Sequence, residues 1–258
     1  MQARSADGTP IAVNRTGEGP ALVMVDPAGA FHGQRPMAGA IPALAERFAV
    51  HTYDRRGRGH SGDTAPFAPD READDLAAVI ELAGGEADVY GFSSGAAVAL
   101  RAAAAGLPIR RVALLEPPFL VGQPADEEFL AELRRLLARG DHGGAVDFFN
   151  RAAGVPDEWI ERLRAHPARA GVEALAPTLV YDAEQTSTMT AALLAAVRTP
   201  VLVLSSAGSD DYLRGAARDV AARLPAGEHR ELPGDWHGVD DAELARQLGE
   251  WFGHAPPG

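Results

Sequence analysis

Short apolar segments alternate with amphipathic helical patterns along most of this chain, and the alternation is its most constraining feature. The segments are rich in Val and Leu, too short for buried helices, and read as buried strands. They span residues 21–25, 48–53, 87–92, 111–116 and 200–205. Between them, Leu76, Val79 and Ile80 share one helical face, and Gly84 ends that pattern. Strands that alternate with helices predict an α/β fold with a mostly parallel sheet and helices on both faces.

The two ends of this pattern differ from its middle. The first residues read as a β-hairpin around the turn Asp7-Gly8, and 229–233 reads as a short polar strand. Residues 119–198 contain only helical patterns, which predicts a helical lid inserted into the core. The expected organisation is a core of 1–118 and 199–258 with this lid between its parts. Extra packing helices are the alternative reading of the insertion.

Composition narrows the function classes. The 258 residues carry a formal net charge of −12, which argues against nucleic acid or an anionic membrane as a partner. No cysteine is present, so a disulfide or a Cys nucleophile is excluded. The N-terminal segment has no apolar signal-peptide region, and no apolar run is long enough for a membrane helix. We therefore expect a cytoplasmic protein that acts on a small molecule.

A serine motif follows the segment 87–92. Gly91-Phe92-Ser93-Ser94-Gly95 matches G-x-S-x-G, which places a serine on a tight turn between a strand and a helix. Small residues are needed two positions before and after the serine because strand and helix crowd there. Ser94 would have Phe92 and Ala96 at those positions, so Ser93 is the better candidate nucleophile. A plain Gly-rich turn is the alternative.

A histidine near the C-terminus has the position of a general base. His237 lies between the last predicted strand and the last predicted helix, and the order nucleophile, acid, histidine fits this site. A histidine here can take the serine proton and return it to the leaving group. His32 and His60 lie in loops, and His51 lies in a buried strand, so none of these is expected to take part in the chemistry.

These motifs resemble the α/β-hydrolase superfamily. The resemblance rests on "GFSSG", "DWHGV" and "YDRRGRGHSGD" (53–63), and it extends to a small bacterial group with a D-R-R-G-R-G-x-S-G-D loop and an E-P-P segment. It implies an α/β-hydrolase fold, with an eight-stranded sheet and a lid between strands six and eight. It also implies that Asp54 and Arg58 fix the turn of the basic loop rather than bind phosphate.

The resemblance also indicates where an oxyanion hole would form. One donor is expected to be the backbone N–H of Ser94, directly after the nucleophile. The other is expected in "VDPAGAF", where many relatives have His-Gly. Pro27 has no N–H, so the donor is Ala28, or else Gly29 or Ala30.

The acid that orients the histidine has rival candidates. In most relatives an Asp follows strand seven, and an ungapped comparison puts its position on Ser209, with Asp210 and Asp211 one and two residues later. Both could instead begin a helix. Glu116 ends the strand after the nucleophile helix, and a charge there is costly without a partner. We favour Glu116 slightly, with Asp210 or Asp211 next.

The sequence therefore predicts a serine hydrolase of the esterase or thioesterase type that cleaves a carboxylic ester, thioester or lactone. Ser93 in place of Asp argues against the dehalogenase and epoxide-hydrolase branches. This chemistry implies no cofactor and no metal. The alternatives are a non-hydrolytic enzyme on the same scaffold and a small-molecule receptor with little turnover. A monomer or a homodimer is expected.

Overall fold

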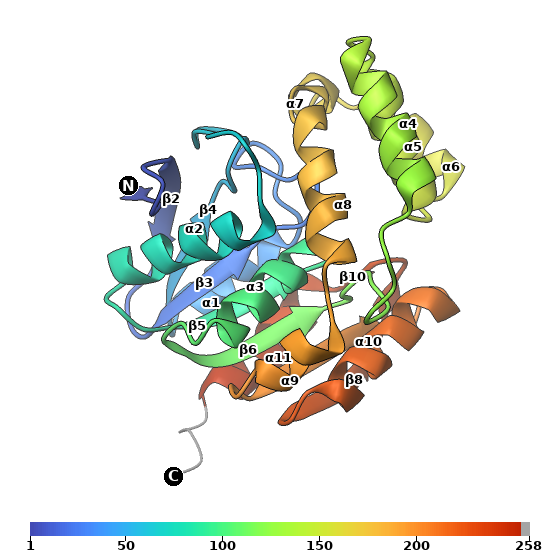
Figure 1. Ribbon diagram of the computed structural model, residues 1–258. Helices are drawn as coiled ribbons and strands as arrows, with labels where there is room; N and C mark the ends of the chain where they lie inside the picture. Colours follow the sequence, from blue (N-terminus) through green and yellow to red (C-terminus); the bar gives the residue numbers. More distant parts are fainter. Residues whose placement is uncertain (254–258) are drawn as a thin grey trace.

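The computed structural model describes residues 1–253, which form an eight-stranded sheet with helices on both sides (Figure 1). The strand order is β1-β2-β4-β3-β5-β6-β7-β8. The strands are β1 (Gln2–Arg4), β2 (Pro10–Thr16), β3 (Ala21–Val25), β4 (Ala49–Tyr53), β5 (Ala87–Phe92), β6 (Ile109–Leu115), β7 (Val201–Ser206) and β8 (Gly227–Leu232). The predicted fold class is confirmed.

Strand direction changes near one edge of the sheet. β1 and β2 form the predicted hairpin, and β2 also pairs with β4 antiparallel, while all later neighbours pair parallel. The order reverses around β3, since β3 lies between β4 and β5. In open parallel sheets, ligand sites form beyond the carboxyl ends of strands near such a reversal. The loops after β3 and β5 both start there.

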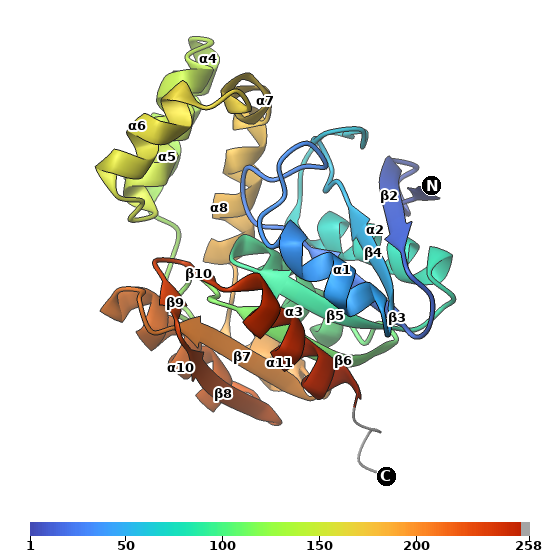
Figure 2. The ribbon, with the colours of Figure 1, turned by 180° about the vertical axis from the view of Figure 1, so that it is seen from behind.

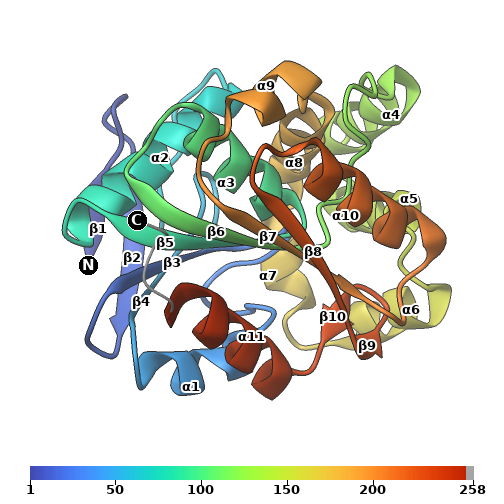
Figure 3. The same ribbon diagram turned by 90° about the horizontal axis from the view of Figure 1, so that it is seen from below.

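Each central strand buries both of its faces, as its continuous apolar sequence predicts. In β3, Val23 and Val25 belong to one core, while Leu22 and Met24 belong to the other. The first core lies under α2 (Pro69–Leu82), α3 (Ser94–Ala104), α9 (Ala191–Ala196) and α10 (Asp211–Arg223). The second lies under α1 (Ile41–Ala45) and α11 (Asp241–Gly253). Figures 2 and 3 show these two helical layers on opposite sides of the sheet.

The helical segment predicted over 119–198 divides into two parts. Most of its helices stand beyond the carboxyl ends of the strands (Figure 1). They are α4 (Glu127–Ala138), α5 (His142–Ala152), α6 (Asp157–Ala165), α7 (Arg169–Ala174) and α8 (Leu179–Ser187). We call α4–α8 the inserted helices; they have a small apolar core of their own, which includes Leu133 and Val146. By contrast, α9 packs on α3 and α10 and belongs to the layer that covers the sheet.

Within the described residues, none of the helices has both the length and the apolar character that a membrane crossing requires.

Candidate active site

Ser93 lies at the sharp turn between β5 and α3. Its backbone has φ 53° and ψ −123°, a conformation that non-glycine residues rarely adopt. Its N–H donates to the carbonyl oxygen of Leu115 at 2.9 Å, which ties the turn to the end of β6. A Cβ at Gly91 would lie 2.7 Å from the carbonyl oxygen of Gly95, and one at Gly95 would collide with the carbonyl oxygen of Val25. The spacing of the motif is therefore steric in origin.

Glu116 directly follows β6 and has no exposed surface. Its φ is 46°, so the chain turns sharply at this residue. One carboxylate oxygen, Oε1, accepts a hydrogen bond from the backbone N–H of Ser206 at 2.8 Å. The other, Oε2, accepts one from the hydroxyl of Ser209 at 3.0 Å. The buried carboxylate is thus fixed by the last residue of β7 and by the loop that follows it.

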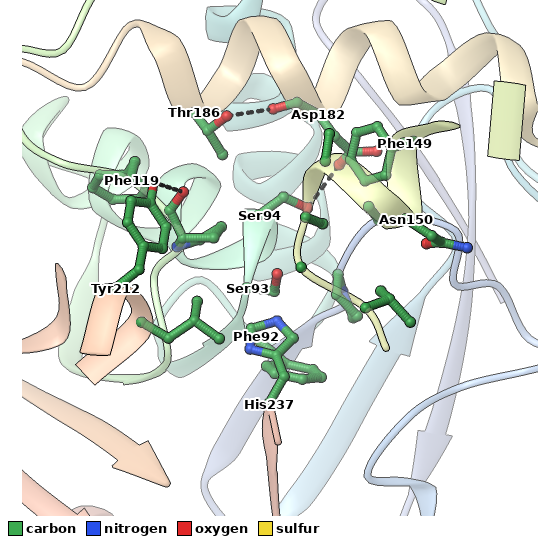
Figure 4. Close-up of a pocket in the computed structure, with 18 of the residues that line it drawn as sticks. Phe92, Ser93, Ser94, Phe119, Phe149, Asn150, Asp182, Thr186, Tyr212 and His237 are labelled. Carbon is green, nitrogen blue, oxygen red and sulfur yellow. Dashed lines mark hydrogen bonds between the residues drawn. The ribbon is translucent and has the colours of Figure 1, made fainter. Parts of the chain in front are cut away.

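His237 lies in the turn between two short strands, β9 (Gly234–Asp235) and β10 (Gly238–Val239). Its Nδ1 is 2.8 Å from Oε2 of Glu116, and its backbone N–H donates to the hydroxyl of Ser209 at 2.8 Å. The ring packs on Phe92, with centroids 4.9 Å apart. In Figure 4 Ser93 lies beside this imidazole. The structure therefore brings Ser93, His237 and Glu116 together.

Asp210 and Asp211 do not join this group. Asp210 is the N-cap of α10, where its carboxylate accepts a hydrogen bond from the N–H of Leu213 at 2.9 Å. Asp211 is the first residue of that helix and is fully exposed. The helix-start interpretation of these two residues is the one that the structure supports.

Ser209 is a part of the site that the sequence reasoning passed over. It hydrogen-bonds to both Glu116 and the backbone of His237. The signal was present, because the ungapped comparison had placed the Asp of the relatives on Ser209. The hydroxyl of Ser209 contacts the backbone of His237. The carboxylate that contacts the ring of His237 comes instead from Glu116, at the end of the neighbouring strand β6.

The candidate oxyanion donors lie beside Ser93. Ala28 and Ser94 line the same cavity as Ser93, whereas Gly29 and Ala30 are not among the described residues that line it. The N–H of Ser94 lies in the first turn of α3, where amides have no intrahelical acceptor. This placement favours Ala28 over the two residues that follow it.

A buried ionic network supports this region from behind. Asp182 of α8 accepts hydrogen bonds from Arg55 and Arg58 at 2.9 Å each, and from the hydroxyl of Ser94 at 2.7 Å. Arg55 also donates to the carbonyl oxygen of Asp26 at 3.1 Å, and Arg58 to that of Pro27 at 3.0 Å. The network therefore holds the inserted helix α8, Ser94 and the loop of Ala28 together.

Burial acts to raise the pKa of Asp182, but the guanidinium groups of Arg58 and Arg55 outweigh it, so this pKa lies below its ordinary value. Burial also raises the pKa of Asp26 to about 6, although Arg35 opposes this with Nε 2.6 Å from Oδ2. Asp182 escaped the sequence analysis because its two arginine partners are more than a hundred residues away along the chain.

The basic loop has a structural role throughout. Arg56 is buried and pairs with Asp75 at 2.8 Å. Asp54 accepts hydrogen bonds from the backbone N–H groups of His32 and His60 at 2.6 and 2.9 Å, and His32 Nδ1 lies 2.9 Å from its Oδ2. His32, Asp54 and His60 are close enough for a metal, with ligand atoms within 4.8 Å. The hydrogen bonds around Asp54 account for this cluster, which lies apart from the cavity lining.

A cavity of about 1290 Å³ opens above Ser93 between the core and the inserted helices. The aromatic residues of the insertion have different roles in it. Phe129, Phe149 and Trp159 line the cavity. Phe148 instead stacks on Phe129, and Tyr181 stacks on a loop residue, Phe67, with centroids 4.0 Å apart. The cavity is large enough for a substrate the size of a typical drug molecule.

A buried carboxylate, a histidine and a serine on a strained turn, held at the carboxyl edge of a mostly parallel sheet, define a hydrolase-type site. The alpha/beta hydrolase family model matches residues 22–247, and the chain belongs to this family. Its fold and family place it among the hydrolases.

Solved structures agree. An alpha/beta hydrolase from Sphaerobacter thermophilus DSM 20745 is 40% identical, with a TM-score of 0.90, over 98% of this chain and 100% of that one. A thermophilic esterase from Thermogutta terrifontis is 22% identical (TM-score 0.74; coverage 98% and 97%). The enol-lactonase from Burkholderia xenovorans LB400 is 21% identical (TM-score 0.73; coverage 98% and 100%). The last two show similarity of fold alone.

Proposed function

We propose that the protein is a serine hydrolase that cleaves a carboxylic ester, thioester or lactone of a small molecule through an acyl-enzyme. The observation that carries this proposal is the arrangement of Ser93, His237 and Glu116, with 2.8 Å between His237 Nδ1 and the carboxylate. An ionised carboxylate can only accept hydrogen bonds, so the His237 proton is on Nδ1. Nε2 is then left free to act as the base.

In this mechanism Ser93 attacks the substrate carbonyl while Nε2 of His237 takes its proton. Glu116 stabilises the imidazolium that forms. His237 then gives the proton to the leaving alcohol or thiol, which departs and leaves Ser93 acylated. Water, deprotonated by the same histidine, releases the acid and restores the serine. The arrangement needs no metal or cofactor for these steps.

The oxyanion of each tetrahedral intermediate would lie between the backbone N–H groups of Ser94 and Ala28. Donors that are already in place stabilise developing charge without reorganisation, and losing one such donor typically costs about 10²–10³ in kcat. The network around Asp182 supports this assignment because it reaches both donor segments. In this reading α4–α8 act as a lid, since Phe129, Phe149 and Trp159 of these helices form part of the apolar wall above Ser93.

The names of two neighbours, an esterase and an enol-lactonase, are compatible with ester or lactone cleavage. At their level of identity they support the scaffold, and the choice of substrate bond rests on the arrangement of Ser93, His237 and Glu116.

The test is hydrolysis of short p-nitrophenyl esters and acyl thioesters by purified protein. Ser93→Ala is expected to lower kcat by about 10⁴ or more, because the nucleophile is lost. Ser187→Ala is the matched control, since Ser187 also lines the cavity but donates its hydroxyl to the backbone of Glu184. Turnover that survives in Ser93→Ala at the rate of the control would overturn the proposal.

A further inference from the structure

Among the described residues that line the cavity above Ser93, His237 is the one basic side chain. The chain contains no lysine, and none of the described residues that line the cavity is arginine. Arg55 lies close behind the wall but is buried, and its charge is matched by Asp182 and Glu72. A bound anion would therefore find no guanidinium or ammonium partner.

Carboxylates instead surround the cavity. Asp126, Asp210, Asp235 and Asp240 line it and are exposed. Three of them accept hydrogen bonds from the N-terminal amides of α4, α10 and α11, so their positions are explained by the helices they cap. They still contribute negative charge to the space that a substrate enters, in a chain whose net charge is −12.

Apart from His237 and the buried Asp182, which pairs with Arg55 and Arg58, the rest of the lining is apolar or neutral. Of the large hydrophobic side chains that are exposed in the described part of the chain, Leu120 (40%), Trp159 (39%) and Tyr212 (48%) all lie at this cavity. Arg162 lies over the ring of Trp159 at 5.8 Å, but Glu158 pairs with it at 3.6 Å. Asn150 is a neutral polar group within the wall.

From this wall we infer that the cavity selects esters that are uncharged and apolar on either side of the scissile bond. Esters that also carry an ionised carboxyl group are rejected. The inference rests on the proposed function and names its substrate class. An ionised group that enters such a cavity loses water without gaining a charged partner, and this is costly. The surrounding aspartates add repulsion that weakens as salt concentration rises.

Two substrates with the same chain between their two carbonyl groups test this selection. Mono-p-nitrophenyl adipate ends in an ionised carboxylate at neutral pH, and methyl p-nitrophenyl adipate ends in a neutral ester at the same position. We expect kcat/KM for the neutral substrate to be higher by about tenfold or more. Equal values, or a preference for the carboxylate, would overturn the inference.

A pair of arginine variants tests whether the cavity wall is the cause. Leu120→Arg places a cation at the cavity. Leu82→Arg adds the same charge at the end of α2, just before β5, and so near the amino ends of the parallel strands, away from the cavity. Leu120→Arg should raise kcat/KM for the carboxylate relative to the neutral substrate several-fold, and Leu82→Arg should leave the ratio unchanged. An equal response of both variants would assign the effect to net charge and overturn the role of the wall.

Binding to Ser93→Ala separates this inference from the proposed function. Calorimetric titration of that variant with the two adipates needs no turnover, and tighter binding of the neutral one is expected. If Ser93→Ala still hydrolyses esters, the proposed function fails while the binding comparison still decides the charge preference. If Ser93→Ala is inactive but binds both adipates equally, the charge preference fails alone.

Discussion

Three residues of the candidate site have positive φ angles although none is glycine: Ser93 (53°), Glu116 (46°) and His237 (51°). Among the described non-glycine residues only Met37 shares this property, and it too lines the cavity. Such conformations cost about 1–3 kcal/mol each and persist only where the surrounding structure imposes them. Here the hydrogen bonds of Ser93 N to β6 and of Ser209 to both other residues impose them.

The identity of the acid gives a prediction for single residues. Glu116→Gln keeps the shape of the side chain but removes the charge that stabilises the imidazolium, so kcat is expected to fall by about 10²–10⁴. Asp210→Asn is the matched control, because Asn caps a helix about as well as Asp and this carboxylate does not touch His237. Its kcat should stay close to that of the wild type.

Asp211→Asn, on a fully exposed residue, should behave like Asp210→Asn. Steady-state kinetics of all three variants decide the question. A larger fall for either Asp variant than for Glu116→Gln would return the acid to the segment after β7.

Part of the site could be predicted from single residues, and part could not. Ser93 and His237 stand in short motifs whose geometry is local, so the sequence identifies them. The choice between Glu116 and Asp210 as the acid depends on which strand end faces His237. That is set by how β6, β7 and the loop of His237 pack together. Ser209 was passed over for the same reason, since its importance comes from two contacts distant in the sequence.

One buried carboxylate, Asp182, links the helix α8 to two arginines of the core. Asp182→Asn removes the carboxylate partner of Arg58 and leaves Arg55 with Glu72 alone. Breaking a buried ion pair in this way typically costs about 3–5 kcal/mol. We expect this loss in the free energy of unfolding, measured in urea at pH 7, together with a lower kcat because Ser94 and the loop of Ala28 lose their support.

Glu184→Gln is the control on the same helix. Its ion pair with Arg134, at 2.7 Å, is solvent-exposed and should contribute only about 0–1 kcal/mol. If Asp182→Asn is no more destabilising than Glu184→Gln, the buried network does not anchor α8.

The same carboxylate predicts a pH dependence. The pKa of Asp182 in the folded protein lies below the ordinary value of 3.8. Between these two pH values the unfolded chain binds more protons than the folded protein does. The contribution of Asp182 to stability is therefore fully present above pH 3.8 and is lost as the pH falls through the lowered pKa. The difference in unfolding free energy between wild type and Asp182→Asn should therefore shrink below pH 4. A difference that is constant from pH 7 to pH 3 would contradict this.

The overall architecture predicts that both faces of the sheet are essential. Leu114 and Leu115 are adjacent in β6 and fully buried, but they belong to opposite cores. Leu114→Ala and Leu115→Ala are each expected to lower the free energy of unfolding by about 2–5 kcal/mol. Leu82→Ala, at a partly exposed site on α2, should change it by only about 0.5 kcal/mol. A small effect at either core position would contradict a sheet covered on both sides.

The fold was the more predictable part of the molecule, because each strand and helix carries its own periodic pattern. Continuous apolar runs such as 87–92 and 200–205 indicate strands buried on both faces without any knowledge of their neighbours. The insertion was harder to divide. α9 follows the inserted helices with no strand between them, and only its packing on α3 and α10 shows that it covers the sheet.

The most direct test of the central claim is covalent labelling of the folded protein with a fluorophosphonate, followed by mass spectrometry of the intact chain and its peptides. The account predicts a single adduct on Ser93, present in the wild type and in Ser187→Ala and absent from Ser93→Ala. A folded protein that takes no label, or a label that persists in Ser93→Ala, would contradict the account.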